Sequence, residues 1–265
     1  MKQAGSGAFI PYVCAGDPDK AFSVELVEAL VRAGADVVEL GLPFSDPVAD
    51  GPVIQKSMQR SLLGGFRTTD IMDMISSMRS RGIAQPIVVM TYYNPVLKHG
   101  VESFCARLAD AGADGILVVD LPLEESEELE AVASNRDIDV IRLVTPSTSD
   151  TRINQILSRS SGFVYAVSVA GTTGAREVLP QSTEALLRRV VRRSPLPVAL
   201  GFGISGPQQV RSALEAGASG VVVGSKLISL YSDGSGVRNE NLAKVQRFAE
   251  SLKAATHGVR KLSIE

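Results

Sequence analysis

Short apolar runs alternate with longer amphipathic segments along the whole chain. The runs are almost uninterrupted in apolar residues, as in IVVM (87–90) and FVYAV (163–167), which is typical of strands covered on both faces. The longer segments carry apolar residues at helical spacing, as in AFSVELVEALVRAG (21–34). The pattern predicts eight strands, over residues 8–13, 35–41, 86–91, 114–120, 140–144, 162–168, 197–201 and 220–224.

Three segments repeat one helix-to-strand junction: AGADVVELG (33–41), AGADGILVVD (111–120) and AGASGVVVGS (216–225). In each, a helix is expected to end at a glycine that tolerates the left-handed cap conformation. Repetition of this unit predicts parallel strands with crossover helices, closed into one (β/α)8 (TIM) barrel domain over residues 1–265. A doubly wound open sheet is the competing architecture, but CAGDPD (14–19) after the first strand lacks its Gly-rich phosphate fingerprint.

Bulk properties restrict the class of protein. A length of 265 residues suits one barrel, and a net charge of −2 offers no electrostatic footprint for nucleic acid or anionic membrane. Two cysteines are too few for a disulfide framework, and neither an N-terminal apolar region nor a long apolar span is visible. We therefore expect a soluble cytoplasmic protein.

Gly-rich turns follow the last three predicted strands: AGTTG (170–174), GFGIS (201–205) and GSKLIS (224–229). Barrels that bind phosphate place the anion at the loops after strands seven and eight and at the start of a short extra helix. Glycine allows the backbone to approach an anion, and free N–H groups at a helix start point towards it. Together the turns predict a phosphate site, although each alone could be an ordinary tight turn.

Carboxylates mark the other candidate chemistry. Glu39 lies inside an apolar strand, where desolvation raises a carboxyl pKa and suits it for acid–base work. Asp46 and Asp50 follow in the loop PFSDPVADGP (43–52), where turn chemistry is the alternative explanation for both. Asp17 and Asp120 also end strands, but each could equally be a cap.

Absent residue types narrow the mechanism further. No lysine falls on a predicted strand, which disfavours a Schiff-base aldolase, and neither His99 nor His257 lies near a strand end with an acid partner. Neither cysteine has a histidine nearby. Carboxylate acid–base chemistry without a metal remains. Aromatic residues near strand ends could line a pocket for a flat apolar ring, or could fill the barrel core: Tyr12, Tyr92, Tyr165 and Phe202.

The motifs AFIPYVCAGDPD (8–19), ELGLPFSDPVADGPVIQ (39–55), YYNPVLKHG (92–100) and GFVYAVSVAGTTGAR (162–176) resemble those of the tryptophan synthase alpha subunit family. The resemblance covers roughly residues 8–255, and ELGLPFSDPVADGP is very specific to that family. It implies a lyase of tryptophan biosynthesis that cleaves indole-3-glycerol phosphate by a retro-aldol reaction, with indole and glyceraldehyde 3-phosphate as products.

The resemblance also implies roles for individual residues. Glu39 matches the acid–base carboxylate, and Asp50 matches the second catalytic carboxylate, which holds the indole N–H. Residues implied to contact the substrate are Tyr12, Tyr92, Leu117, Tyr165, Thr173, Gly174, Gly201, Phe202, Gly203, Gly224 and Ser225. The segment 169–177 matches a mobile lid.

The family further implies a beta subunit partner in an α2β2 complex, with pyridoxal phosphate on that partner and no cofactor on this chain. By analogy, the interface would be the C-terminal mouth of the barrel, including the loop after Glu39 and Asn94–Pro95. The chain departs from the family at Tyr12, where phenylalanine is frequent, and at Cys14, where threonine is common. Only MKQAGSG precedes AFIPY, where the family usually has a further helix, so a less well plugged barrel bottom is expected.

Three alternatives stay open at this stage. Another phosphate-binding barrel enzyme, such as a sugar-phosphate isomerase, would share the late glycine turns and would use an acid or cysteine after the first strand, for which Cys14 and Asp17 are the candidates. A barrel retained only as an activator of a beta subunit would need neither Glu39 nor Asp50. A stand-alone lyase that releases free indole is not distinguished from the channelled form by sequence.

Overall fold

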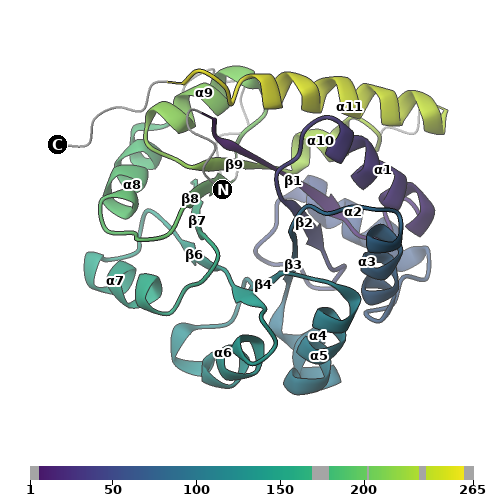
Figure 1. Ribbon diagram of the computed structural model, residues 1–265, viewed down its shortest axis with the longest axis horizontal. Coiled ribbons are helices and arrows are strands. Elements are labelled where there is room, and N and C mark those ends of the chain that lie inside the picture. The colour runs from purple at the N-terminus through teal and green to yellow at the C-terminus, as the bar shows by residue number, and fades with distance from the viewer. Residues whose placement is uncertain (1–5, 169–178, 202, 233–236, 260–265) are drawn as a thin grey trace.

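A ring of parallel strands surrounded by helices forms the protein, seen along the barrel axis in Figure 1. The computed structural model describes residues 6–168, 179–201, 203–232 and 237–259. The strand order is β5-β4-β3-β2-β1-β9-β8-β7-β6, with every pairing parallel. The strands are β1 (Ala8–Cys14), β2 (Val38–Gly41), β3 (Ile87–Thr91), β4 (Gly115–Val118), β5 (Asp139–Val140), β6 (Arg142–Val144), β7 (Val164–Val167), β8 (Val198–Gly201) and β9 (Gly220–Val223).

The sequence predicts one strand over residues 140–144, whereas the structure divides it into β5 and β6 at Ile141. Strand β5 pairs with β4 and β6 pairs with β7, so this short piece of chain joins the two ends of the sheet. The amide of Ile141 still donates to the carbonyl of Ile116 (2.9 Å). The predicted barrel is therefore confirmed and is nearly closed, because the described strands show no pairing between β4 and β6.

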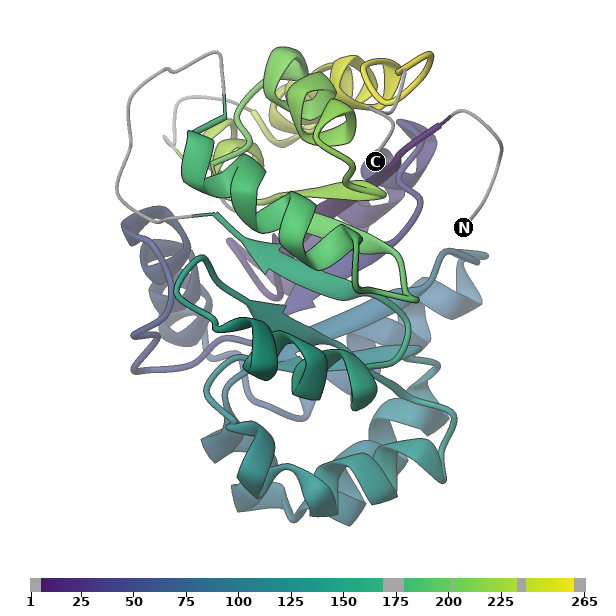
Figure 2. The same ribbon diagram turned by 90° about the vertical axis from the view of Figure 1, so that its left-hand side faces the viewer.

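Helices cover the outer surface of the barrel, as Figure 2 shows from the side. Asp19 caps the start of helix α1, since its carboxylate accepts from the amide of Phe22 (2.7 Å), and α2 has proline at its first position. The helices are α1 (Lys20–Arg32), α2 (Pro52–Leu63), α3 (Asp70–Ser80), α4 (Tyr93–His99), α5 (Val101–Ala111), the 3-10 turn η1 (Leu123–Glu125), α6 (Glu127–Ser134), α7 (Asp150–Ser158), α8 (Gln181–Val191), α9 (Pro207–Glu215), α10 (Ser225–Ser229) and α11 (Arg238–Ala254).

The predicted glycine junctions are confirmed by backbone geometry. Gly34, Gly112 and Gly217 have φ values of +97°, +94° and +105°, in the left-handed region that a residue with a side chain rarely adopts. Each allows the chain to leave a helix and enter the next strand. The repeated αβ unit is therefore a property of the fold as well as of the sequence.

Register determines which residues face the barrel axis. Tyr12 lies opposite Glu39 in the pairing of β1 with β2, and Glu39 lies opposite Val88 in β3. Paired residues point to the same side of a sheet, and alternate residues to opposite sides. Tyr165 in β7 occupies the corresponding face on the other side of the barrel, beside Ala199. The two tyrosines and Glu39 thus share the interior.

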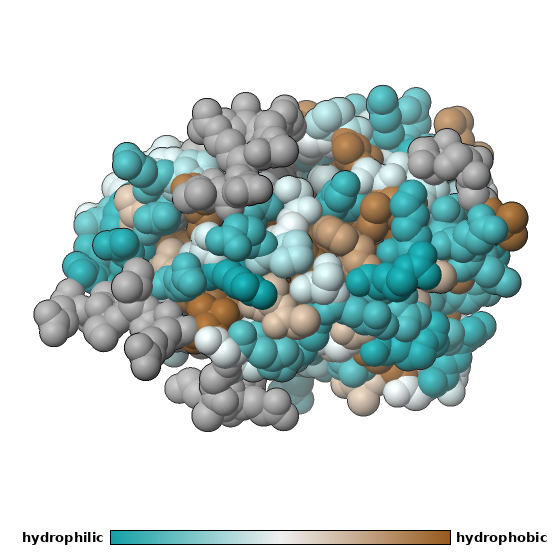
Figure 3. Space-filling view, turned by 90° about the horizontal axis from the view of Figure 1, so that it is seen from above, coloured by the Kyte–Doolittle hydropathy of each residue, from teal (hydrophilic) through white to brown (hydrophobic). Residues whose placement is uncertain are grey.

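The outer surface is mainly polar where it can be seen. Figure 3 views the molecule from the side of α9 and α11, and hydrophilic residues cover most of this face, with hydrophobic residues scattered among them. Scattered apolar residues are normal for a protein surface and do not by themselves mark an interface. Within the described residues, no helix combines the length and apolar character that a membrane crossing requires.

Candidate active site

One cavity lies at the C-terminal ends of the strands, where barrel enzymes place their chemistry. It brings together residues from β1, β2, β3, β7 and β9, from the start of α2, from the turn after β8 and from the start of α10. Its lining residues are Tyr12, Glu39, Ile54, Met90, Tyr165, Gly203, Ile204, Val222, Gly224 and Ser225. The carboxylate and the late glycine turns that the sequence singles out therefore line one cavity.

Glu39 is the buried acid of this cavity. Its side chain is 1% exposed, and neither carboxylate oxygen has a hydrogen-bond partner among the described residues. Burial, reinforced by the negative charge of Asp50, raises the pKa of Glu39 from 4.5 to about 8. A carboxyl group with a pKa near neutrality can both give and accept a proton at physiological pH.

Asp50 does not itself line this cavity, but it lies near enough to Glu39 for its charge to raise the pKa of that acid, and a tyrosine holds it in place. The hydroxyl of Tyr92 donates to Asp50 Oδ2 (2.7 Å) and accepts from the amide of Ala49 (3.0 Å). Asp50 Oδ1 is buried and has no partner among the described residues. Burial raises the pKa of Asp50, and the bond from Tyr92 opposes that rise. Asp50 thus keeps one oxygen for an incoming donor.

The neighbouring acid of the same loop has a different environment. Asp46 is exposed, and its Oδ2 accepts from the hydroxyl of Ser45 (2.5 Å). Asp50 is 6% exposed, and its carbonyl accepts from the amide nitrogen of Gln55 in α2 (2.8 Å). Of the two acids, only Asp50 has the burial and fixed position that acid–base or electrostatic work requires.

Two tyrosines occupy space that two glycines leave open. A Cβ atom at Gly41 would collide with the ring end of Tyr12, and one at Gly201 would collide with the ring end of Tyr165. Tyr12 is 3% exposed and its hydroxyl has no partner among the described residues. Burial raises the pKa of both tyrosines well above the ordinary value, so both remain neutral hydrogen-bonding groups.

Two turns form the side of the cavity where the sequence predicts a phosphate. Gly203 has a φ of +80°, a conformation that favours glycine, and Gly224 directly precedes α10, which begins at Ser225. The first amides of a helix lack partners within the helix and can face a ligand. Lys226 is exposed and does not line the cavity.

Other residues named from the sequence lie elsewhere. Leu117 is fully buried in β4, opposite Met90, but it does not line the cavity, whereas Met90 does. Tyr92 acts on the site through Asp50, and Gly201 through Tyr165. Thr173, Gly174, Phe202 and the lid segment 169–177 lie outside the described residues.

Asp17 is a fully buried structural residue. Its carboxylate accepts from Arg60 Nε (2.8 Å) and Nη2 (2.7 Å), from Ser57 and from the hydroxyl of Tyr231 (3.0 Å). Asp17 therefore joins the turn after β1 to α2 and to the segment after α10.

Asp120 is not the N-cap of the helical turn that follows it; instead its Oδ1 accepts from the amide of Tyr93, the first residue of α4 (2.7 Å).

The thiol and histidine candidates also lie outside the cavity. Cys14 is buried and its pKa is raised to about 12, mainly by burial, so its thiol is a poor nucleophile. His99 contacts the carbonyl of Pro95 through Nδ1 (3.1 Å). Among the described residues, no group of three or more His, Cys, Asp or Glu side chains is arranged to hold a metal ion.

Comparison with known proteins gives a consistent result over the whole chain. A family model described as the tryptophan synthase alpha chain matches residues 1–257. The tryptophan synthase alpha chain of Methanosarcina acetivorans is 45% identical over 258 residues, which are 97% of this chain and 92% of the relative. That of Arabidopsis thaliana is 41% identical over 255 residues, covering 96% and 92%. A solved chain from the tryptophan synthase α2β2 complex of Pyrococcus furiosus superimposes with a TM-score of 0.89 at 42% identity, covering 94% of this chain and 99% of that one.

Proposed function

The chain belongs to the tryptophan synthase alpha chain family, and from this premise we propose that it is a lyase that cleaves indole-3-glycerol phosphate to indole and glyceraldehyde 3-phosphate. One observation carries the assignment to this site. Glu39, whose pKa lies near neutrality, lines the same cavity as the anion-binding turns at Gly203 and Gly224. One substrate could therefore contact both the acid–base group and the phosphate-binding turns within this cavity.

Glu39 is proposed as the acid–base group of the retro-aldol step. Because its pKa is about 8, it starts protonated at neutral pH and can give its proton to the ring carbon that bears the glycerol side chain. The resulting carboxylate then takes the proton of the side-chain hydroxyl next to the scissile bond. As that C–C bond breaks, its electrons return to the ring, and indole and the aldehyde are released.

Asp50 is proposed to stabilise the ring while it is protonated. Its free Oδ1 can accept the indole N–H, which gains positive character when the ring carbon is protonated. Tyr92 fixes the other oxygen, so Asp50 is oriented before the substrate arrives. Tyr12, Tyr165 and Met90 supply apolar surface around the ring.

The phosphate is proposed to lie against the turns after β8 and β9. Gly203 lines the cavity from the turn after β8, and Gly224 and Ser225 line it at the start of α10, where backbone N–H groups are available. Leu117, Gly201, Thr173, Gly174 and Phe202 remain proposed substrate-site residues on the strength of the family motif alone.

The partner is proposed to be a tryptophan synthase beta subunit in an α2β2 complex. Two large apolar side chains are exposed near the mouth: Val48, which is 84% exposed in the loop before α2, and Leu97, which is 58% exposed in α4. Val48 lies in the loop that the family analogy assigns to the interface, and Leu97 lies two residues beyond Asn94–Pro95, so the proposal rests on that analogy and these side chains are consistent with it. Pyridoxal phosphate would belong to that partner and no cofactor to this chain. A cytoplasmic location and a single domain over residues 1–265 complete the proposal.

Turnover of indole-3-glycerol phosphate tests the proposal directly. The purified chain should form indole and glyceraldehyde 3-phosphate, and Glu39→Gln should reduce kcat by about 100-fold or more, because it removes the acid–base group. Asp46→Asn is the matched control for Asp50→Asn, since both acids lie in one loop and only Asp50 is buried. Wild-type turnover by Glu39→Gln would remove the mechanism.

Addition of a beta subunit separates the remaining alternatives. A rate enhancement on mixing supports the α2β2 form, whereas indole formation that the beta subunit leaves unchanged indicates a stand-alone lyase. Stimulation of the beta subunit by a chain without indole formation indicates a non-catalytic activator. A sugar-phosphate isomerase would form no indole under any of these conditions.

A further inference from the structure

A second cavity lies at the barrel wall, between the end of β4, the strand pair β5–β6 and the helices α6 and α7. Its volume is about 180 Å3, and it shares no lining residue with the cavity around Glu39. Val140 and Arg142 alternate along the chain with Ile141 and Leu143, and Leu143 pairs with the interior residue Tyr165. Val140 and Arg142 therefore point away from the barrel axis, into the layer below the helices.

Apolar side chains and two arginines line this cavity, and somewhat more of its accessible surface is polar than apolar. Leu121, Leu123, Leu129 and Ile156 are among the apolar members, and Arg142 and Arg152 are the charged ones. A cavity of about 150 Å3 with apolar walls is large enough to hold a benzene ring. The available space thus suits a single ring or a branched aliphatic chain.

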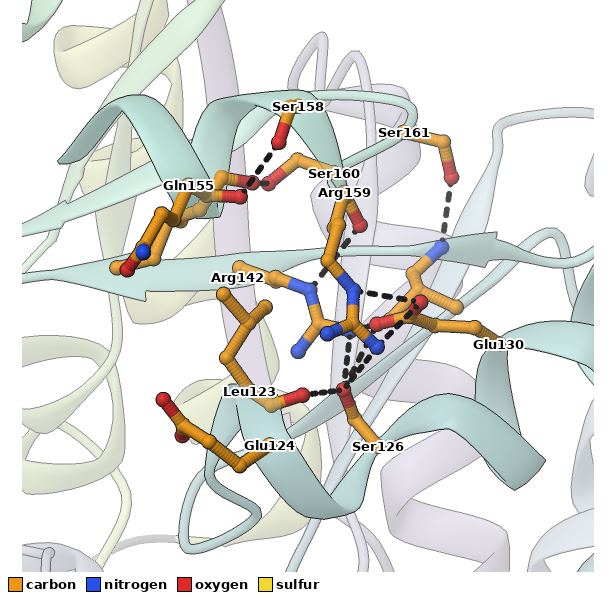
Figure 4. A network of polar contacts seen from close by, with 12 residues as sticks. Leu123, Glu124, Ser126, Glu130, Arg142, Gln155, Ser158, Arg159, Ser160 and Ser161 are labelled. Atoms are coloured by element: carbon orange, nitrogen blue, oxygen red, sulfur yellow. Dashed lines mark hydrogen bonds and ion pairs between the residues drawn. The ribbon is translucent and has the colours of Figure 1, made fainter. Parts of the chain in front are cut away.

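Arg142 is fixed rigidly by three bonds. Its Nε donates to the carbonyl of Arg159 (3.1 Å), and its Nη2 donates to the hydroxyl of Ser126 (2.9 Å) and to Glu130. A guanidinium has five N–H donors, so the two on Nη1 remain, and no described residue accepts them. In Figure 4, the terminal nitrogen of Arg142 without a dashed line lies on the side of Leu123, which lines the cavity.

Charge around the cavity favours an anion. Glu130 is shared by Arg142 and by Arg159, whose Nε donates to Glu130 Oε2 (2.9 Å). Arg152 at the rim pairs with Glu124. Three guanidinium groups therefore face two carboxylates in these ion pairs. The side chain of Arg142 is only 9% exposed, while its unpartnered Nη1 remains reachable from solvent.

We propose that this cavity binds a small monocarboxylate with an apolar body, whose carboxylate accepts from Nη1 of Arg142 and whose ring or branched chain fills the space between α6 and α7. One surplus positive charge matches one carboxylate, and the apolar walls match the body. A phosphate dianion would bring a second charge that no further free cation of the cavity lining offsets.

Benzoate and its neutral isostere benzamide test the proposal with the full-length chain. By ligand-observed NMR titration, benzoate should bind with a Kd on the order of 1 mM, typical of a small fragment, and benzamide at least about tenfold more weakly. Arg142→Met should weaken benzoate binding at least about tenfold, because a charge-assisted hydrogen bond is lost. Arg159→Met is the comparison variant: it removes the surplus charge of the network but leaves Nη1 of Arg142 in place, so it should weaken benzoate binding less than Arg142→Met does.

Leu121→Phe keeps the proposal testable if Arg142→Met fails to fold, since it fills the space and leaves every bond of Arg142 intact. It should also weaken benzoate binding. Equal binding of benzamide, wild-type affinity in Arg142→Met or in Leu121→Phe, or absence of saturable benzoate binding would overturn the proposal. Glu39→Gln should leave the Kd unchanged, and loss of binding in that variant would place benzoate in the barrel site instead.

Discussion

Replacement of Glu39 by glutamine is expected to stabilise the protein as the pH rises. In the unfolded chain Glu39 releases its proton near pH 4.5, whereas in the folded chain burial delays release until about pH 8. The contribution of this group to stability is complete below pH 4.5 and is lost progressively as the pH rises to about 8. Glutamine has nearly the same shape but does not ionise, so the variant does not lose stability in this way as the pH rises.

The magnitude follows from the two pKa values. They differ by about 3.5 pH units, and each unit corresponds to about 1.36 kcal/mol, so wild type loses at most about 5 kcal/mol through Glu39. Between about pH 5 and pH 8, the free energy of unfolding of Glu39→Gln should gain about 4 kcal/mol relative to wild type. Such a gain alongside lost turnover is the trade-off expected of a group kept for activity rather than stability.

Urea unfolding of both proteins at several pH values measures this difference directly. Glu130→Gln is the control, because Glu130 is paired with Arg142 and Arg159, and its replacement should reduce stability instead. A stability difference between Glu39→Gln and wild type that does not change with pH would refute the reasoning. It would mean that Glu39 is ionised and fully hydrogen-bonded in the free protein.

Three further outcomes follow from the same site. Asp50→Asn should lower kcat/KM about 100-fold, and because the charge of Asp50 raises the pKa of Glu39, the pH at which kcat/KM falls, about 8 in wild type, should move lower. Tyr12→Phe should leave the free energy of unfolding unchanged or raise it by up to about 1 kcal/mol, since its hydroxyl has no partner among the described residues, whereas Tyr92→Phe should cost about 1–3 kcal/mol through its two lost bonds. In urea titrations, Gly41→Ala should cost about 1–3 kcal/mol, because the added methyl group meets the ring end of Tyr12.

Sequence patterns predict most of the barrel because its strands are short, apolar and bounded by turns. The helix-to-strand junction at Gly34 can be predicted from the sequence, because the left-handed backbone conformation at that position favours glycine. The break at Ile141 cannot be predicted from the sequence, because residues 140–144 form one uniform apolar run. The break depends on which neighbouring strand each half pairs with. Pairing is a long-range property that local periodicity does not encode.

The candidate site divides in the same way. Glu39 is conspicuous in the sequence because a carboxylate interrupts an apolar strand. Met90 and Val222 line the cavity but have no chemical signal, since apolar strand residues are equally typical of the core, and only register turns them inward. The bond between Tyr92 and Asp50 joins residues 42 positions apart and likewise depends on the closed barrel.

The buried carboxylate of Asp17 connects the two sides of the candidate site, the segment from the Asp50 loop to α2 and the segment around α10. Helix α2 follows the loop of Asp50, and its residues Ser57 and Arg60 donate hydrogen bonds to the carboxylate of Asp17. Tyr231, just beyond α10, donates to the same carboxylate. Helix α10 also packs against α2. A protein that docks on the Asp50 loop and shifts α2 would therefore also displace the proposed phosphate site at α10, so binding of the phosphate and orientation of the indole are expected to change together.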